Sequence, residues 1–123
     1  MKLRILDNAL RLRLSRPEID RLIAGESVEA QTAFPGSTSL RFGVYPAACD
    51  DVTATFTAGA IVVQLPLAAA RLFADDDVTT FTVNVNSGGQ SLRVTVEKDF
   101  QCLAPRDEDE SLLFAHPQTG QRC

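Results

Sequence analysis

The feature that most constrains the fold of this chain is a repeat of its N-terminal stretch. The stretch Lys2–Leu14 is matched, 51 positions later, by Thr53–Leu65. In both stretches apolar and polar residues alternate on either side of a two-residue turn, Asp7-Asn8 or Ala58-Gly59. Alternation with a period of two places the apolar side chains on one face of a strand, and a short turn joins two such strands into a hairpin. The sequence therefore predicts the same half-apolar hairpin twice.

A helix is predicted after each hairpin. Ser15–Glu18 has the S-x-x-E form of a capping box and precedes apolar residues at helical spacing, and Gly25 ends that helix. The second helix begins at Pro66, whose fixed φ suits a first helical turn, and stops at Asp75–Asp77. A second hairpin then follows each helix, with turns at Pro35-Gly36 and Ser87–Gly89. Its strands are Val28–Phe34 with Ser39–Tyr45 in the first half, and Val78–Val85 with Ser91–Lys98 in the second.

The predicted order is strand, strand, helix, strand, strand, twice over, which indicates an internal duplication. The apolar positions fall on even numbers in the strand ending at Phe34 and on odd numbers in the strand ending at Val85, and a bulge would reconcile them. We expect an α+β fold with two helices and a mostly antiparallel sheet or partly closed barrel, built from two ββαββ units related by a pseudo-twofold axis. The single domain spans 1–123, with unit one at 2–45, a linker at 46–52, unit two at 53–98 and an irregular acidic tail at 99–123.

Composition narrows the class of protein. With 45% hydrophobic residues in 123, the chain is long enough for one compact core. No run of eighteen apolar residues and no leader pattern is present, so we expect a cytoplasmic protein with no membrane segment. Three irregularly spaced cysteines do not resemble a disulfide framework. The net charge of −4 argues against general nucleic-acid binding.

Two end motifs resemble those of a known family. These are the N-terminal strand Leu10-Arg-Leu-Arg-Leu14, preceded by Lys2-Leu-Arg-Ile5, and Val96-Glu-Lys-Asp-Phe-Gln-Cys-Leu103 followed by an acidic run. The pattern resembles a family of small uncharacterised bacterial proteins, a domain of unknown function, over nearly the whole chain. The resemblance implies no catalytic or ligand-binding residues.

A cluster of basic residues is the first candidate site. Alternation places six basic side chains on the outward face of the predicted sheet, where guanidinium groups at fixed spacing suit carboxylates or phosphates. The corresponding positions of the second repeat are neutral. The alternative is that these are ordinary solvent-facing residues that also discourage aggregation. The six residues are Lys2, Arg4, Arg11, Arg13, Arg41 and Arg93.

An acidic pair is the second candidate. Glu97 and Asp99 share one face if the last strand runs that far, and could hold a hard cation such as Mg²⁺ or act in acid–base chemistry. The alternative is cross-strand ion pairing with Arg11, Arg13 or Arg41.

The tail contains the third candidate, a zinc site formed by Cys102, His116 and Cys123, with Cys49 as a fourth ligand. The spacing lacks a short chelating clip, so a buried structural Cys102 and a surface His116 are the alternative.

The acidic run Asp107–Glu110 and the apolar trio Leu112–Phe114 also lie in the tail. The run is either solvated or folds back onto the basic face, anchored by the trio, in cis or from a neighbouring molecule.

No known catalytic motif is present. We expect no cofactor, and our leading hypothesis is a small binding module that presents its basic face to an anionic ligand or an acidic protein segment. The alternatives are an enzyme acting on an anionic, phosphorylated small molecule, and a structural homodimer that pairs exposed edges such as Lys2–Leu6.

Overall fold

The computed structural model describes residues 1–100, and its strands and helices follow the predicted order. The first half contains β1 (Lys2–Leu6), β2 (Ala9–Leu14), α1 (Arg16–Ile23), β3 (Val28–Phe34) and β4 (Thr38–Ala47). The second half contains β5 (Thr53–Thr57), β6 (Ala60–Pro66), α2 (Leu67–Leu72), β7 (Thr80–Ser87) and β8 (Gln90–Lys98). The α+β class and the two helices are confirmed.

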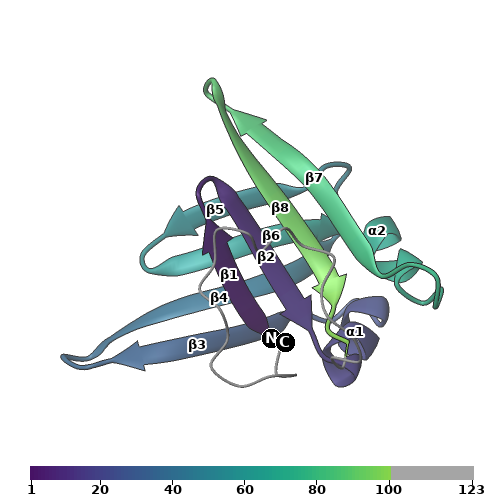
Figure 1. The fold of residues 1–123 in the computed structure, drawn as a ribbon, viewed down its shortest axis with the longest axis horizontal. Coiled ribbons are helices and arrows are strands. Elements are labelled where there is room, and N and C mark those ends of the chain that lie inside the picture. Colours follow the sequence, from purple (N-terminus) through teal and green to yellow (C-terminus); the bar gives the residue numbers. More distant parts are fainter. Residues whose placement is uncertain (101–123) are drawn as a thin grey trace, which may run out of the picture.

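The strands form two four-stranded sheets, which we call the first and the second sheet (Figure 1). The first sheet has the order β1-β2-β8-β7 and the second the order β3-β4-β6-β5. Every hairpin is antiparallel, whereas the central pairs β2/β8 and β4/β6 are parallel. In Figure 1 the first sheet lies in front, and its strands cross those of the second at a steep angle.

This arrangement corrects the expected single sheet or partly closed barrel. Each helix is a crossover that carries the chain from one sheet to the other, so the two hairpins of a half lie in different sheets. Each sheet therefore combines hairpins from both halves and stays open at its edges. The pairing registers of β3/β4 and β7/β8 are also uninterrupted, so the expected bulge is absent from both hairpins.

The core lies between the sheets and under the helices. Side chains on the inner faces of the central strands are almost fully buried, with Leu12 and Leu65 at 0% exposure. The helices have eight and six residues, and Leu22 of α1 and Phe73, the C-cap residue of α2, belong to the same cluster. Neither helix in the described part of the chain is long and apolar enough to cross a membrane. Both helices lie at one end of the sheets (Figure 1).

The start of α1 is fixed by the predicted capping residues. The Glu18 carboxylate accepts a hydrogen bond from the Ser15 backbone N–H at 2.9 Å, as in a capping box. Its other oxygen pairs with the Met1 ammonium at 2.9 Å. Burial by itself raises the pKa of Glu18, but the ammonium and the Ser15 hydrogen bonds outweigh it and lower the pKa below its ordinary value.

Candidate functional site

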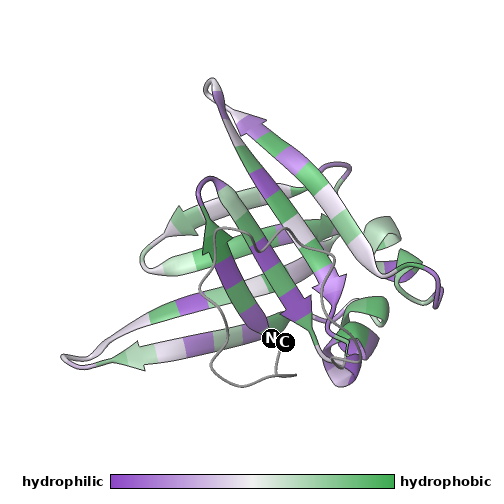
Figure 2. Ribbon diagram, in the orientation of Figure 1, coloured by the Kyte–Doolittle hydropathy of each residue, from purple (hydrophilic) through white to green (hydrophobic). Residues whose placement is uncertain are grey.

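Five of the six predicted basic residues lie on the outer face of the first sheet. In Figure 2 hydrophilic and hydrophobic bands alternate along β1, β2 and β8, as a sheet with one solvated face requires. Lys2 pairs directly with Arg13, and Arg4 with Arg11, across the β1/β2 ladder. Arg93 lies on β8, in register with Ala9 of β2. We call this surface the basic face. It comprises Lys2, Arg4, Arg11, Arg13 and Arg93.

Glu97 is bound by two of these arginines. Its Oε1 atom accepts a hydrogen bond from Arg13 Nε at 2.6 Å and lies 3.6 Å from Arg11 Nε. The Glu97 side chain is only 17% exposed. The parallel register of β2 and β8 sets this contact, because Glu97 lies directly beside Arg13. The cross-strand ion pairing considered as the alternative role of Glu97 is therefore present.

The remaining charges of the face are less compensated. Asp99 Oδ2 pairs with Lys2 Nζ at 2.9 Å, and the Lys2 side chain is 74% exposed. Arg4 and Arg93 are exposed and have no ion pair among residues 1–100. Five cations and two carboxylates leave the face with three net positive charges, in a chain whose net charge is −4.

Arg41 lies apart from the other five. It is on β4, in the second sheet, paired with Gln31 of β3 and Ala60 of β6. Its neighbour on the same face is Tyr45, whose pKa is raised by burial and by Glu29, with Arg41 acting in the opposite direction. The six basic residues therefore do not share one surface, because the two hairpins of the first half lie in different sheets.

The predicted metal and acid–base residues are not assembled into a site within residues 1–100. Both members of the acidic pair, Glu97 and Asp99, are engaged by cations. The described part of the chain has no group of three or more His, Cys, Asp or Glu side chains placed to hold a metal ion. Cys49 is half-buried. The other proposed zinc ligands, Cys102, His116 and Cys123, lie outside the described residues, as do the acidic run and the apolar trio.

A second feature, which sequence reasoning missed, is an apolar cleft between the two sheets. It is lined by residues at or near the β1/β2, β5/β6 and β7/β8 turns and by no residue of α1 or α2, and it has a volume of about 500 Å³. Ile5 and Phe56 form its lip and are 58% and 71% exposed. Apolar side chains line its walls, and Asn8, Thr55, Ser87, Gln90 and Ser91 supply polar groups. The apolar lining residues are Ile5, Leu10, Leu40, Ala54, Phe56, Ile61, Val85 and Leu92.

The cleft lies beyond the part of the inner faces that the short helices cover, since no residue of α1 or α2 lines it. Ile5 and Phe56 lie on the apolar faces that the alternation predicts for the two hairpins, directly opposite Leu10 and Ile61. A helix of six to eight residues is only about 9–12 Å long, whereas a five- or six-residue strand spans about 17–20 Å. The helices therefore cover one end of the inner faces. No local sequence pattern shows this uncovered end, because it depends on how the two sheets and the helices pack together.

Comparison with known proteins adds a family and no function. No curated protein and no solved structure matches the chain. A model for a family of unknown function, DUF7009, matches residues 1–118. This range includes nearly all of the chain and every residue of the basic face and the cleft. The chain therefore belongs to this family of unknown function.

Proposed function

We propose that the chain is a non-catalytic binding module whose basic face binds an acidic segment of a protein partner. The observation that carries this proposal is the placement of cations directly opposite one another on β1 and β2. Lys2 faces Arg13, and Arg4 faces Arg11. Like charges in directly opposed positions destabilise a sheet, by up to about 1 kcal/mol for a pair.

The stability of the sheet does not account for the placement of cations opposite one another on β1 and β2. A solvated face could alternate signs across the ladder, which would stabilise the sheet instead. Glu97 offsets only part of the repulsion, since its carboxylate serves Arg11 and Arg13 together. A face that retains uncompensated cations at a cost in stability is suited to a ligand that supplies the missing negative charge.

The spacing of the cations favours an extended segment over a compact anion. Side chains two residues apart on a strand, such as Lys2 and Arg4 or Arg11 and Arg13, project about 7 Å apart. An extended peptide with acidic residues at alternate positions has the same period, so several carboxylates can pair at once. The rival enzyme hypothesis needs a free carboxylate, whereas Glu97 is held by Arg13 and Arg11. The enzyme hypothesis therefore has no observation in its favour comparable to the opposed cations.

The homodimer hypothesis stays a prediction. β1 is an edge strand of the first sheet, and no strand within residues 1–100 pairs with its outer side. The backbone groups on that side could therefore pair with the β1 strand of a second copy. Mass measurement in solution tests this pairing separately from ligand binding, because a strict monomer would exclude it.

The experiment is a titration of a fluorescein-labelled peptide of alternating Asp and Glu residues, followed by fluorescence anisotropy. The test variant is Arg4→Glu/Arg93→Glu, which reverses the two exposed cations of the basic face that have no ion pair within residues 1–100. The control is Arg41→Glu/Arg71→Glu, which changes the chain's charge equally but lies on the second sheet and on α2. Circular dichroism confirms that both variants are folded.

We expect the test variant to lose affinity by roughly tenfold or more, because two surface ion pairs of up to about 1 kcal/mol each become repulsions. The affinity of the control variant should be within a few-fold of that of the parent chain. Added salt should weaken peptide binding by the parent chain and by the control variant. Equal losses in the two variants would mean that the peptide senses only the overall charge. That result would refute the proposal.

A further inference from the structure

The apolar cleft is a feature of the described fold that the proposed function does not use. Its volume of about 500 Å³ falls within the range of pockets that enclose a ligand. Phe56 and Ile5 are among the most exposed apolar side chains of residues 1–100, and both line it. Contiguous apolar surface of this kind on a soluble domain commonly marks a binding site. We therefore expect an apolar group to bind in the cleft.

We infer that Leu112–Phe114 of the same chain docks in this cleft. This trio is the one run of three large apolar residues in the sequence beyond residue 100. It lies between the polar stretches Arg106–Ser111 and Pro117–Arg122, so it is a short apolar segment of the size that a cleft between two sheets accepts. Asn8 Nδ2 donates a hydrogen bond to the Ser91 carbonyl oxygen beside the cleft, and the side chains of Ser87 and Gln90 add polar groups that the backbone of the trio can contact.

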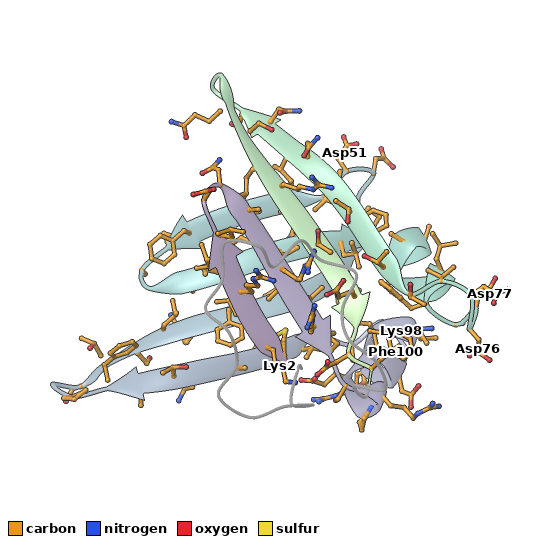
Figure 3. The ribbon with its side chains drawn as sticks, viewed as in Figure 1. Lys2, Asp51, Asp76, Asp77, Lys98 and Phe100 are labelled. Atoms are coloured by element: carbon orange, nitrogen blue, oxygen red, sulfur yellow. The ribbon has the colours of Figure 1, made fainter. Side chains whose placement is uncertain are left out.

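The length of the tail permits this docking. Asp99 pairs with Lys2 at the start of β1, and Phe100 lies near that same end of the molecule (Figure 3). From there the cleft lip at Ile5 is one short strand away, about 17 Å for the five residues of β1. The twelve residues that follow Phe100, up to and including Leu112, can span up to about 40 Å. The tail can therefore follow a curved path to the cleft.

Charge complementarity supports the path. A segment running from Asp99 toward Ile5 passes over the outer face of β1, where Lys2 and Arg4 lie. The acidic run Asp107–Glu110 falls between the starting point and the trio. Four acidic residues would thus cross a face with three net positive charges, and the ion pairs would guide the trio to the cleft.

The test uses the absence of tryptophan from the chain. The variant Phe114→Trp, in the full chain, places a single tryptophan in the trio. We expect blue-shifted emission and protection from quenching by acrylamide, unchanged on dilution of the protein. Adding Phe56→Asp, a change at a 71% exposed lip residue, should shift the emission to the red and raise the quenching constant several-fold. Adding Phe34→Asp instead is the matched control, because Phe34 is 52% exposed and does not line the cleft.

Three results would overturn the inference. One is a tryptophan that is solvent-exposed from the outset, and another is protection that Phe56→Asp leaves intact. The third is protection that disappears on dilution, which would assign the cleft to the tail of a second copy.

A second measurement covers the case in which tryptophan itself disturbs docking. In the full chain, Leu112→Ser/Leu113→Ser/Phe114→Ser should uncover the cleft and raise the fluorescence of an added apolar dye such as ANS several-fold. The increase should be lost when Phe56→Asp is added. Equal dye binding by the parent chain and the serine variant would show that the trio does not fill the cleft.

The docking does not rest on the proposed function, because it concerns the inner faces of the sheets. It does have a consequence for that function, since the acidic run then competes for the basic face. The serine variant should bind the acidic peptide several-fold more tightly than the parent chain, and equal affinity would argue against docking. A peptide that binds neither protein would refute the function, while the tryptophan result would still decide the docking.

Discussion

Replacing Glu97 with Gln separates the structural role of the basic face from its proposed binding role. The substitution keeps the size of the side chain and an acceptor oxygen beside Arg13, but removes the negative charge that Arg13 and Arg11 share. We expect the protein to become less stable and, at the same time, to bind an acidic peptide more tightly.

The loss of stability follows from the contact itself. A hydrogen bond to a charged group contributes about 1.5–3 kcal/mol, against about 0.5–1.5 kcal/mol for a neutral one. Arg11 and Arg13 are 37% and 25% exposed, and solvent screening reduces the difference. We therefore expect a loss of about 1 kcal/mol, which corresponds to a decrease in Tm of roughly 3–5 °C for a domain of this size.

The gain in binding follows from the charge that the substitution frees. The net charge of the face rises from three to four, and Arg11 and Arg13 lose their shared partner. One further surface ion pair is worth up to about 1 kcal/mol, or about fivefold in affinity at low salt. Anisotropy with the acidic peptide measures this gain, and Glu26→Gln, in the loop after α1, is the control of equal charge change. If Glu97→Gln bound no more tightly than the control, the face would not be the peptide's site.

Three further predictions concern the fold. Leu12→Ala, at a side chain with 0% exposure, should cost about 2–5 kcal/mol in denaturant unfolding, and Ile5→Ala, at 58% exposure, far less; similar losses would mean that the cleft is closed. Because the pKa of folded Glu18 is lowered, its contribution to stability is present above its ordinary value of 4.5 and is lost as the pH falls through the folded pKa. Glu18→Gln should remove that acid-side part of the decrease in Tm, and an unchanged Tm profile would contradict the assignment. Gly43→Ala should cost about 1–3 kcal/mol, because the added Cβ would lie 2.9 Å from the ring of Tyr45 and from the Val28 carbonyl oxygen; a neutral result would show that the strand can shift there.

The sequence was sufficient to predict the local elements. Alternation located the hairpins, and the capping box placed the start of α1 at the residue after Ser15. Turn chemistry was also informative, since Asp7 and Ala58 both adopt positive φ, at 49° and 52°. These features are determined by residues close together in the sequence, so local sequence patterns are sufficient to predict them. The common origin of the two halves stays a prediction, although the element order repeats.

Long-range pairing could not be read from local patterns. The parallel pairing of β2 with β8 joins residues such as Arg13 and Glu97, which are 84 positions apart, and no turn residue specifies it. The partners of Glu97 were among those considered, but Arg41 was placed on the wrong surface for the same reason. The cleft was missed because alternation shows only which face of the sheet a side chain occupies. Predicting that Ile5 is exposed also requires knowing how far the helices cover that face.

The most direct test of the basic face is a map of where the acidic peptide binds. The full chain, labelled with ¹⁵N, is titrated with the unlabelled peptide, and backbone amide shifts are followed by NMR. The account predicts that the shifts concentrate on β1, β2 and β8, with the largest near Arg4 and Arg93, and that they disappear in Arg4→Glu/Arg93→Glu. Shifts centred on β3–β6, or spread evenly over the surface, would contradict the proposed binding face.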